Sequence, residues 1–373
     1  MRVLVAPDKF KGTLTSAEVA SHIVEGLRSA RPDIETDAVP IADGGDGFLD
    51  AFAAAGFERV EVRATDASGV AGSTAYARRG GQAIIELAKV AGLTSCRSDR
   101  APLTATSRGV GEVVAAALDA GCRRILLGVG GSASTDGGIG MVQGLGVRVR
   151  DSSGRDAGPG GLGAMRARAI DLTSLHPALA EARLEVACDV DIPLTGPLGA
   201  AVLFGPQKGA DPEQVQLLDI ALGRWADLVC RTTGTDSRAT AGAGAAGGIG
   251  FAAAALLGAC LRPGAQLVLD FLDIPASVAR ADLVITGEGL LDKQTLQGKA
   301  PAAIAASAQK AQVAVVAVVG HCHLDSEQLR AAGFSRVYTL VEEVAGSEDE
   351  ALAFPAPLLR RIGAKIAQTL SPA

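Results

Sequence analysis

The chain has 373 residues, which exceeds the usual size of one compact core and predicts about two domains. Its net charge of −6 and its aromatic content of 3% argue against a nucleic-acid-binding surface, which needs a basic face and stacking rings. The longest apolar stretch, residues 250–261, is too short to span a bilayer, and only a brief apolar run precedes Asp8. Six scattered cysteines without a CxxC pair favour reduced, mostly buried thiols. We therefore expect a cytoplasmic protein with neither nucleic-acid nor membrane partners, and the sequence predicts no oligomeric state.

Short apolar runs alternate with helical patterns along the chain. The runs lie at residues 2–6, 124–129, 184–188, 201–204, 282–286 and 313–319, and helical patterns include residues 111–121 and 301–311. Such runs are typical of strands buried on both faces of a parallel sheet, so the fold class is α/β. Residues 58–64 and 73–79 instead alternate like antiparallel strands and indicate a second subdomain. We place one discontinuous domain at 1–65 and 275–373 and the other at 66–274.

The loop APDKFKGTLTS (residues 6–16) joins the first predicted strand to the first predicted helix. Thr15 and Glu18 form a T-x-x-E capping box, so the helix should begin near Ser16. Gly12 permits a close approach, and a helix N-terminus presents unpaired N–H groups to an anion. By itself the loop is as compatible with solvated lysines as with an anion site.

Three further segments are rich in glycine. IADGGDG (41–47) suits either Mg²⁺ or a simple turn. GVGGSASTDGGIG (128–140) follows a predicted strand, and its backbone N–H groups could cradle phosphates, although no Gly-Lys-Ser/Thr completes a Walker A motif. AGAGAAGGIG (241–250) contains G-x-G-x-x-G, but the polar segment before it is not a strand. We interpret it as a loop that leads into a tightly packed helix.

The remaining charged loops follow later apolar runs. Asp189 comes just past the run 184–188, and Lys208 lies in a glycine turn after 201–204. The long polar loop 286–301 contains two carboxylates and two lysines before a helix opened by proline. Because the carboxyl ends of parallel strands meet at one edge, these loops together supply cations, glycine N–H groups and carboxylates. Those are the groups that phosphoryl transfer requires.

At these residues the chain resembles the bacterial type I glycerate kinase family. The matching segments, in order between residue 6 and about residue 299, are APDKFKGTLTS, PIADGGDG, GVGGSASTDGG, ACDV, FGPQKGA, GAGAAGG and ITGEGLLDKQTLQGK. The resemblance implies transfer of the γ-phosphoryl group of ATP, with Mg²⁺, to D-glycerate, usually at the 2-hydroxyl to give 2-phosphoglycerate. It also implies two α/β domains, one Rossmann-like with a parallel sheet and discontinuous in sequence, the second mixed, with the active site in the cleft. Members often carry Arg where Leu290 stands.

Loop position and resemblance together suggest the catalytic and metal-binding residues. Asp189 is expected to orient the attacking hydroxyl or to take its proton, with Lys11 and Asp8 as further catalytic candidates. Asp43 and Asp292 are the Mg²⁺ candidates.

The ligand-binding candidates come from the same loops. Lys9, Arg108 and Gln294 are expected to bind the substrate, with Arg108 as a bidentate clamp on its carboxylate. The nucleotide-binding candidates are Gly130, Gly131, Ser132, Thr135, Lys208, Glu288 and Lys299. Two alternatives stay open: phosphorylation of the 3-hydroxyl, and an NAD(P)-dependent hydroxy-acid oxidoreductase that uses the glycines at 242–247.

Overall fold

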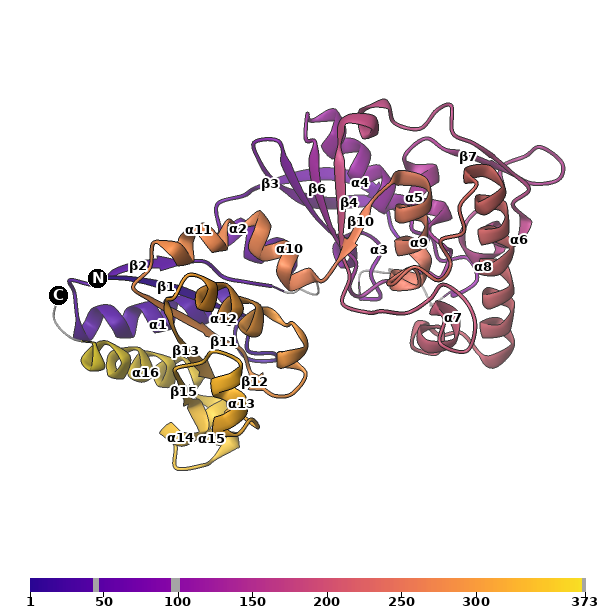
Figure 1. The fold of residues 1–373 in the computed structure, drawn as a ribbon. Coiled ribbons are helices and arrows are strands. Elements are labelled where there is room, and N and C mark those ends of the chain that lie inside the picture. The colour runs from indigo at the N-terminus through magenta and orange to yellow at the C-terminus, as the bar shows by residue number, and fades with distance from the viewer. Residues whose placement is uncertain (43–46, 95–100, 371–373) are drawn as a thin grey trace. The chain divides into compact units, whose positions relative to one another are not determined.

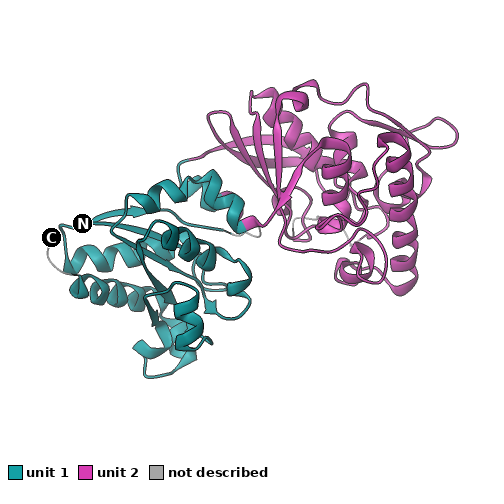
Figure 2. Cartoon of the chain, viewed as in Figure 1, with its two compact units in different colours: residues 1–43, 50–56, 265–373 teal, residues 44–49, 57–264 magenta. Residues whose placement is uncertain are grey.

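The computed structural model describes residues 1–42, 47–94 and 101–370 (Figure 1). The chain divides into two compact units (Figure 2). Unit 1 comprises Met1–Asp43, Asp50–Gly56 and Ala265–Ala373, and unit 2 comprises Gly44–Leu49 and Phe57–Gly264. Both units combine helices with sheets, which confirms the predicted α/β class. The domain boundaries suggested near residues 65 and 275 stay a prediction. The nearest points at which the chain passes from one unit to the other lie at Phe57 and Ala265.

Unit 1 is built on a five-stranded parallel sheet. The strand order is β15 (Arg336–Thr339), β13 (Ala314–Val319), β11 (Leu283–Gly287), β1 (Arg2–Pro7) and β2 (Glu35–Ala38). Strands β11 and β1 are mostly apolar and almost wholly buried, as parallel strands covered on both faces should be. Counted along unit 1 alone, the order is 2-1-3-4-5, a doubly wound arrangement whose switch point lies between β1 and β11.

Helices and one small strand pair complete unit 1. The helices are α1 (Ser16–Ala30), α2 (Phe48–Ala54, shared with unit 2), α10 (Gly264–Phe271), α11 (Ile274–Ala279), α12 (Ala300–Lys310), α13 (Ser326–Ala331), α14 (Leu340–Glu343), α15 (Glu348–Ala353) and α16 (Pro355–Thr369). The strand pair is β12 (Leu290–Leu291) with β14 (His321–Cys322). The Thr15–Glu18 capping box is present at the start of α1, as predicted.

Helices α1 and α16 bring the two ends of the chain together (Figure 1). Their contact is close because each helix has a glycine at the crossing. A Cβ on Gly26 would lie 2.0 Å from the carbonyl oxygen of Arg360, and one on Gly363 would lie 2.4 Å from that of Ile23. The helix backbones therefore touch where side chains would otherwise separate them.

Unit 2 is built on a six-stranded mixed sheet. The strand order is β10 (Cys260–Arg262), β9 (Arg183–Ala187), β6 (Arg124–Gly128), β5 (Gln82–Glu86), β4 (Ala71–Arg79) and β3 (Glu58–Thr65). The first four strands run parallel to one another, β4 is antiparallel to β5, and β3 is antiparallel to β4. The hairpin β3–β4 confirms the antiparallel pair that the alternating pattern predicted.

Helices cover this sheet and bury a large apolar core. They are α3 (Leu87–Ala91), α4 (Arg108–Asp119), α5 (Ile139–Gly144), α6 (Gly160–Arg166), α7 (Ala200–Phe204), α8 (Pro212–Thr233) and α9 (Ala245–Leu257), and a small pair joins β7 (Arg148–Arg150) to β8 (Ala169–Asp171). Trp225 and Phe251 lie in the core. Among the described residues, we find no helix with the length and apolar character to cross a membrane.

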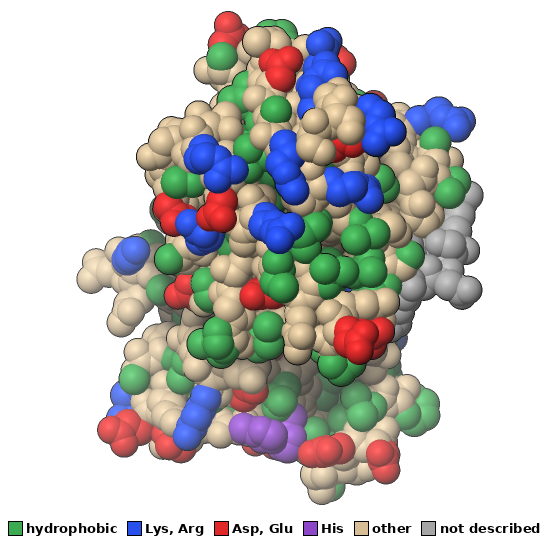
Figure 3. Space-filling model, turned by 90° about the vertical axis from the view of Figure 1, so that its right-hand side faces the viewer, with side chains coloured by type: hydrophobic (Ala, Val, Ile, Leu, Met, Phe, Trp, Pro, Cys, Tyr) green, Lys and Arg blue, Asp and Glu red, His purple; other side chains and the backbone are tan. Residues whose placement is uncertain are grey.

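Two sequence-based expectations are wrong. The run at 201–204 is not a strand but helix α7, in which Ala200 and Ala201 are buried while Val202 and Leu203 are exposed. An apolar run of this length fits either element, and here only its alanines reach the core. Figure 3 shows hydrophobic side chains at the surface on the face that it draws. The thiols are not mostly buried either: of the described cysteines only Cys122 is fully buried.

Candidate active site

In unit 2, three neighbouring parallel strands end side by side at one edge of the sheet. Glu86 of β5 is in register with Gly128 of β6, which is in register with Ala187 of β9. The glycine-rich segment 129–138 follows β6, and Asp189 follows β9. The register thus brings a glycine loop and a carboxylate to the same edge, as the sequence predicted.

The glycine loop, residues 129–138, is fixed by a buried carboxylate. Asp136 Oδ2 accepts hydrogen bonds from the backbone N and the Oγ of Ser107, both at 2.8 Å, and Oδ1 accepts one from Gly138 N at 3.0 Å. Burial raises the pKa of Asp136, and these hydrogen bonds oppose the rise. Ser107 Oγ in turn accepts from Met141 N, so Asp136 ties the loop to the first turns of α4 and α5.

A second glycine segment supports the loop from the other side. Ala246, Gly247 and Gly248 all have positive φ, and Gly247 O accepts a hydrogen bond from Gly137 N at 2.9 Å. A Cβ on Gly247 would lie 2.1 Å from Ser134 O. These glycines therefore serve close packing against the loop, as predicted. The preceding residues, 234–244, are all described and contain no strand, so the oxidoreductase alternative loses its dinucleotide motif.

Lys208 reaches the glycine loop from the turn after α7. Its side chain is buried, and Nζ donates to Ser134 O at 2.5 Å and to Ser132 Oγ at 3.3 Å. Ser132 is also buried, and its Oγ donates to the carbonyl of Ala246 at 3.2 Å. The structure thus brings Lys208 and Ser132 together, and Lys208 contacts the loop at two of its buried residues, Ser132 and Ser134. Thr135 is buried there as well, whereas Gly131 is exposed and Gly130 partly so.

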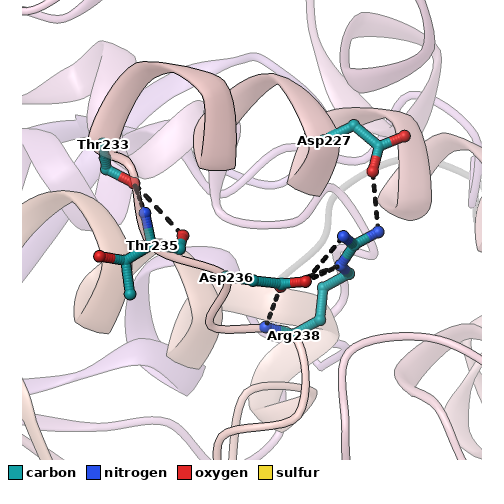
Figure 4. Close-up of polar contacts among 5 residues, drawn as sticks. All are labelled: Asp227, Thr233, Thr235, Asp236 and Arg238. Atoms are coloured by element: carbon teal, nitrogen blue, oxygen red, sulfur yellow. Dashed lines mark hydrogen bonds and ion pairs between the residues drawn. The ribbon is translucent and has the colours of Figure 1, made fainter.

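Asp189 lies at the surface, on a well-supported loop. Its Oδ1 accepts a hydrogen bond from Gly264 N at 2.8 Å. The following residues are held by the connection between α8 and α9, since Leu194 N donates to Arg238 O and Gly244 N donates to Ile192 O. Arg238 fixes that connection through Asp236 and Asp227 (Figure 4). The carboxylate of Asp189 is therefore held in place while facing solvent.

Arg108 is the first residue of α4, on the same unit. Its Nε donates to Glu112 Oε1 at 3.0 Å, and the side chain is about half exposed. Glu112 also accepts from the backbone N of Thr65 at 2.7 Å. If Arg108 bound a substrate carboxylate, its guanidinium would have to bind both that carboxylate and Glu112. The role of Arg108 as a carboxylate clamp therefore stays a prediction.

In unit 1, two charged loops leave the switch point of the sheet. Asp8 follows β1 and Glu288 follows β11, and Asp8 N donates to Gly287 O at 2.7 Å. Lys9 N donates to Asp8 Oδ1 at 2.7 Å, and both Asp8 and Glu288 are buried. Residues 10–14 then form a tight turn whose tip exposes Lys11. This is the edge at which doubly wound sheets bind ligands.

The loop after β11 is closed by a buried threonine. Thr295 Oγ1 donates to Glu288 Oε1 at 2.5 Å, and Asp292 Oδ1 accepts from the backbone N of Gln294 and of Thr295. Burial acts to raise the pKa of Asp292, but these hydrogen bonds and the charge of Lys299 outweigh it and keep the pKa below its usual value. Lys299 Nζ lies 3.4 Å from Gln294 Oε1, and the neighbouring Leu290 is exposed.

Asp292 is suited to a hard cation, whereas the other predicted Mg²⁺ ligand, Asp43, lies outside the described residues. Asp292 is ionised, and its Oδ2 takes no hydrogen bond from a described residue. Within residues 1–42, 47–94 and 101–370 no group of three or more His, Cys, Asp or Glu side chains is arranged to hold a metal. Mg²⁺ needs no such cage, because it is usually bound through one or two carboxylates together with substrate phosphates.

Several residues of these edges were not anticipated. Glu86 is buried and accepts from Leu49 N at 2.8 Å, which fixes the start of α2 next to the segment 41–47. Ser107 fixes the glycine loop through Asp136, and Thr295 fixes the loop after β11 through Glu288. Glu86 could have been found from the sequence, since it is a charged residue at the end of the apolar run AIIE, just as the predicted site residues follow apolar runs. No sequence pattern of this kind marks Ser107 or Thr295.

Comparison with known proteins identifies the class. A family model described as the glycerate kinase family matches residues 3–371. A glycerate kinase from Bacillus subtilis is 40% identical over 94% of this chain and 92% of its own length, and a glycerate 2-kinase from Escherichia coli is 38% identical over 100% and 98%. A crystal structure named as glycerate kinase 2 from Salmonella typhimurium LT2 matches with a TM-score of 0.88 and 40% identity, covering 99% of this chain and 98% of that one.

The two α/β units and their charged strand-end loops, together with these matches, define a kinase, that is, a phosphotransferase. The chain belongs to the glycerate kinase family. The resemblance seen in its loop motifs is therefore confirmed.

Proposed function

We propose that this chain transfers the γ-phosphoryl group of MgATP to the 2-hydroxyl of D-glycerate and forms 2-phosphoglycerate. One observation carries the proposal: the glycine loop and Asp189 follow adjacent parallel strands of unit 2. That pairing supplies N–H groups for phosphate oxygens next to a carboxylate for the attacking hydroxyl. The choice of the 2-hydroxyl is supported by the relative named glycerate 2-kinase.

The residues of unit 2 divide between nucleotide and substrate. Gly130 and Gly131 offer their N–H groups to the phosphates, with Ser132 and Thr135 behind them. Asp189 orients the 2-hydroxyl and accepts its proton late in a loose transition state. Arg108 contacts the carboxylate of D-glycerate.

The residues of unit 1 supply charge at the switch point. Lys9 and Lys11 bind the substrate carboxylate or the transferring phosphoryl group, with Asp8 at the base of their loop. Asp292 and Asp43 hold Mg²⁺, which neutralises charge on the phosphates when it is bound. Glu288, Gln294 and Lys299 complete the loop that carries Asp292.

A coupled assay of ADP release with D-glycerate tests the proposal. We expect turnover that requires both MgATP and D-glycerate, followed by NMR of the product that shows phosphate on the 2-hydroxyl. Phosphate on the 3-hydroxyl would overturn the regiochemistry alone. If D-glycerate at millimolar concentration gave no ADP above background, the proposed reaction itself would be wrong.

Lys11→Ala is expected to lower kcat/KM for D-glycerate roughly 10- to 100-fold, because a hydrogen bond to a charged group is worth about 1.5–3 kcal/mol. Lys11 is exposed, so its loss should leave the melting temperature unchanged. Lys310→Ala, an exposed lysine at the end of α12, is the matched control and should change neither quantity. If Lys11→Ala has the activity of this control, Lys11 is an ordinary solvated lysine.

A further inference from the structure

We propose that Lys208 is a positioning residue: its ammonium group holds the glycine loop from the inside, and it does not itself touch the nucleotide. This inference rests on the proposed function, since it assigns the loop to the phosphates. It changes the expected role of Lys208 from a direct phosphate contact to an indirect one.

The geometry places the ammonium behind the loop. Lys208 is only 4% exposed, and its Nζ donates to Ser134 O and Ser132 Oγ. Ser132 Oγ bridges onward to the carbonyl of Ala246 in the supporting segment. One cation thus joins the loop, the turn after α7 and the start of α9. Gly131 is exposed, so a phosphate could approach the loop there from solvent, whereas the ammonium group of Lys208 is buried.

A buried ammonium is costly, which argues for a specific task. Burial lowers the pKa of Lys208 from 10.5 to about 8, and the charge of Asp136 offsets only part of this effect. Ser134 Oγ and Thr135 Oγ1 are also buried and take no hydrogen bond from any described residue. Buried hydroxyls are normally paired, so this loop has an incomplete set of hydrogen bonds, as expected of a loop that awaits a ligand.

Because the pKa of Lys208 is lowered, nucleotide affinity and folding stability should change in opposite directions as the pH rises. Below about pH 8 the ammonium is charged, its hydrogen bonds are charge-assisted, and the loop is held. As the pH rises through about 8, the charge is lost and nucleotide affinity should fall. Between about 8 and 10.5 the unfolded chain binds more protons at this lysine than the folded protein does, so folding stability should rise over that range. A merely structural lysine would not affect nucleotide affinity.

Trp225 offers a direct readout of the loop. It is the single tryptophan of the sequence, it is fully buried, and its Nε1 donates to Gly137 O at 3.0 Å. A Cβ on Gly137 would lie 2.6 Å from the indole Cδ1, so the ring packs directly against the loop. A shift of the loop must therefore change the environment of the indole.

The experiment compares the unchanged chain with Lys208→Met and with Lys310→Met as the control. MgADP affinity is measured by calorimetry at about pH 7 and about pH 9, kcat and KM for MgATP by ADP release, and Trp225 emission between these pH values. We expect Lys208→Met to weaken MgADP binding and raise the KM for MgATP roughly 10- to 100-fold, with kcat changed less than about threefold. The unchanged chain and the control should show a Trp225 transition near pH 8 that Lys208→Met lacks.

Ser132→Ala keeps the lysine and supplies a second test should Lys208→Met fold poorly. It should weaken MgADP about threefold, and adding Lys208→Met should cost no more than Lys208→Met alone, because both act through one network. The proposal is overturned if MgADP affinity is unchanged in Lys208→Met, if kcat falls together with affinity, or if Lys208→Met keeps the Trp225 transition. Failure of the proposed function would show differently, as no phosphorylation of D-glycerate by the unchanged chain.

Discussion

Asp189→Asn is expected to lower kcat for D-glycerate phosphorylation about a thousandfold and to leave the KM for MgATP within about threefold. A carboxylate that orients the hydroxyl and takes its proton contributes about 10²- to 10⁴-fold to such a reaction, and the amide cannot take the proton. The amide oxygen can still accept the hydrogen bond from Gly264 N, so the loop after β9 should keep its shape. Steady-state kinetics by ADP release measures both constants.

Asp191→Asn is the matched control for this prediction. Asp191 is exposed two residues further along the same loop and has no role in the proposed reaction. It should retain the kcat of the unchanged chain. A folded Asp189→Asn protein that turns over as fast as this control would show that Asp189 is not the base.

Gly26→Ala is expected to destabilise unit 1 by about 3 kcal/mol, at the upper end of the usual cost of overpacking. The new methyl carbon would lie 2.0 Å from Arg360 O and 2.8 Å from Arg360 C, and both atoms belong to the backbone of α16. The higher helix propensity of alanine, worth up to about 1 kcal/mol, cannot compensate, because the two helices must separate. Calorimetric scans should show a lower unfolding temperature.

Gly223→Ala distinguishes packing from helix propensity. Gly223 lies within α8, and a Cβ there would meet no atom within 4 Å. The same substitution should therefore stabilise unit 2 by about 0.5–1 kcal/mol. If both alanine variants were stabilised, the contact between α1 and α16 would not be as tight as described.

Much of the fold could be predicted because its strands carry an unambiguous pattern. Residues 282–286 and 313–319 are continuous apolar runs, and they correspond to β11 and β13 in the centre of a sheet. The run at 201–204 was misassigned because four apolar residues are compatible with helix or strand. The order of the strands could not be read from local patterns, since it depends on contacts between residues far apart in the chain.

The candidate site was predictable only at the level of loops. Asp189 and the glycine loop were found because chemistry-bearing residues follow buried strands, and β6 and β9 are indeed neighbours. The burial of Lys208 was not foreseeable, because a lysine in a glycine turn looks exposed until the packing of α7 is known. The support from Ser107 and Thr295 depends on tertiary hydrogen bonds that leave no periodic signal.

The discontinuity of unit 1 determines when its parts can fold during synthesis. The N-terminal strand β1 pairs with β11, and the hydrogen bond from Arg2 N to Asp282 spans 280 residues. Residues 57–264 of unit 2 form one continuous stretch and can fold as soon as they leave the ribosome. Strand β1 is made before that stretch yet remains without β11 until the stretch is complete, and α1 waits for α16, which follows later still. A chain truncated before α16 would thus carry a finished unit 2 on an unfinished and aggregation-prone unit 1.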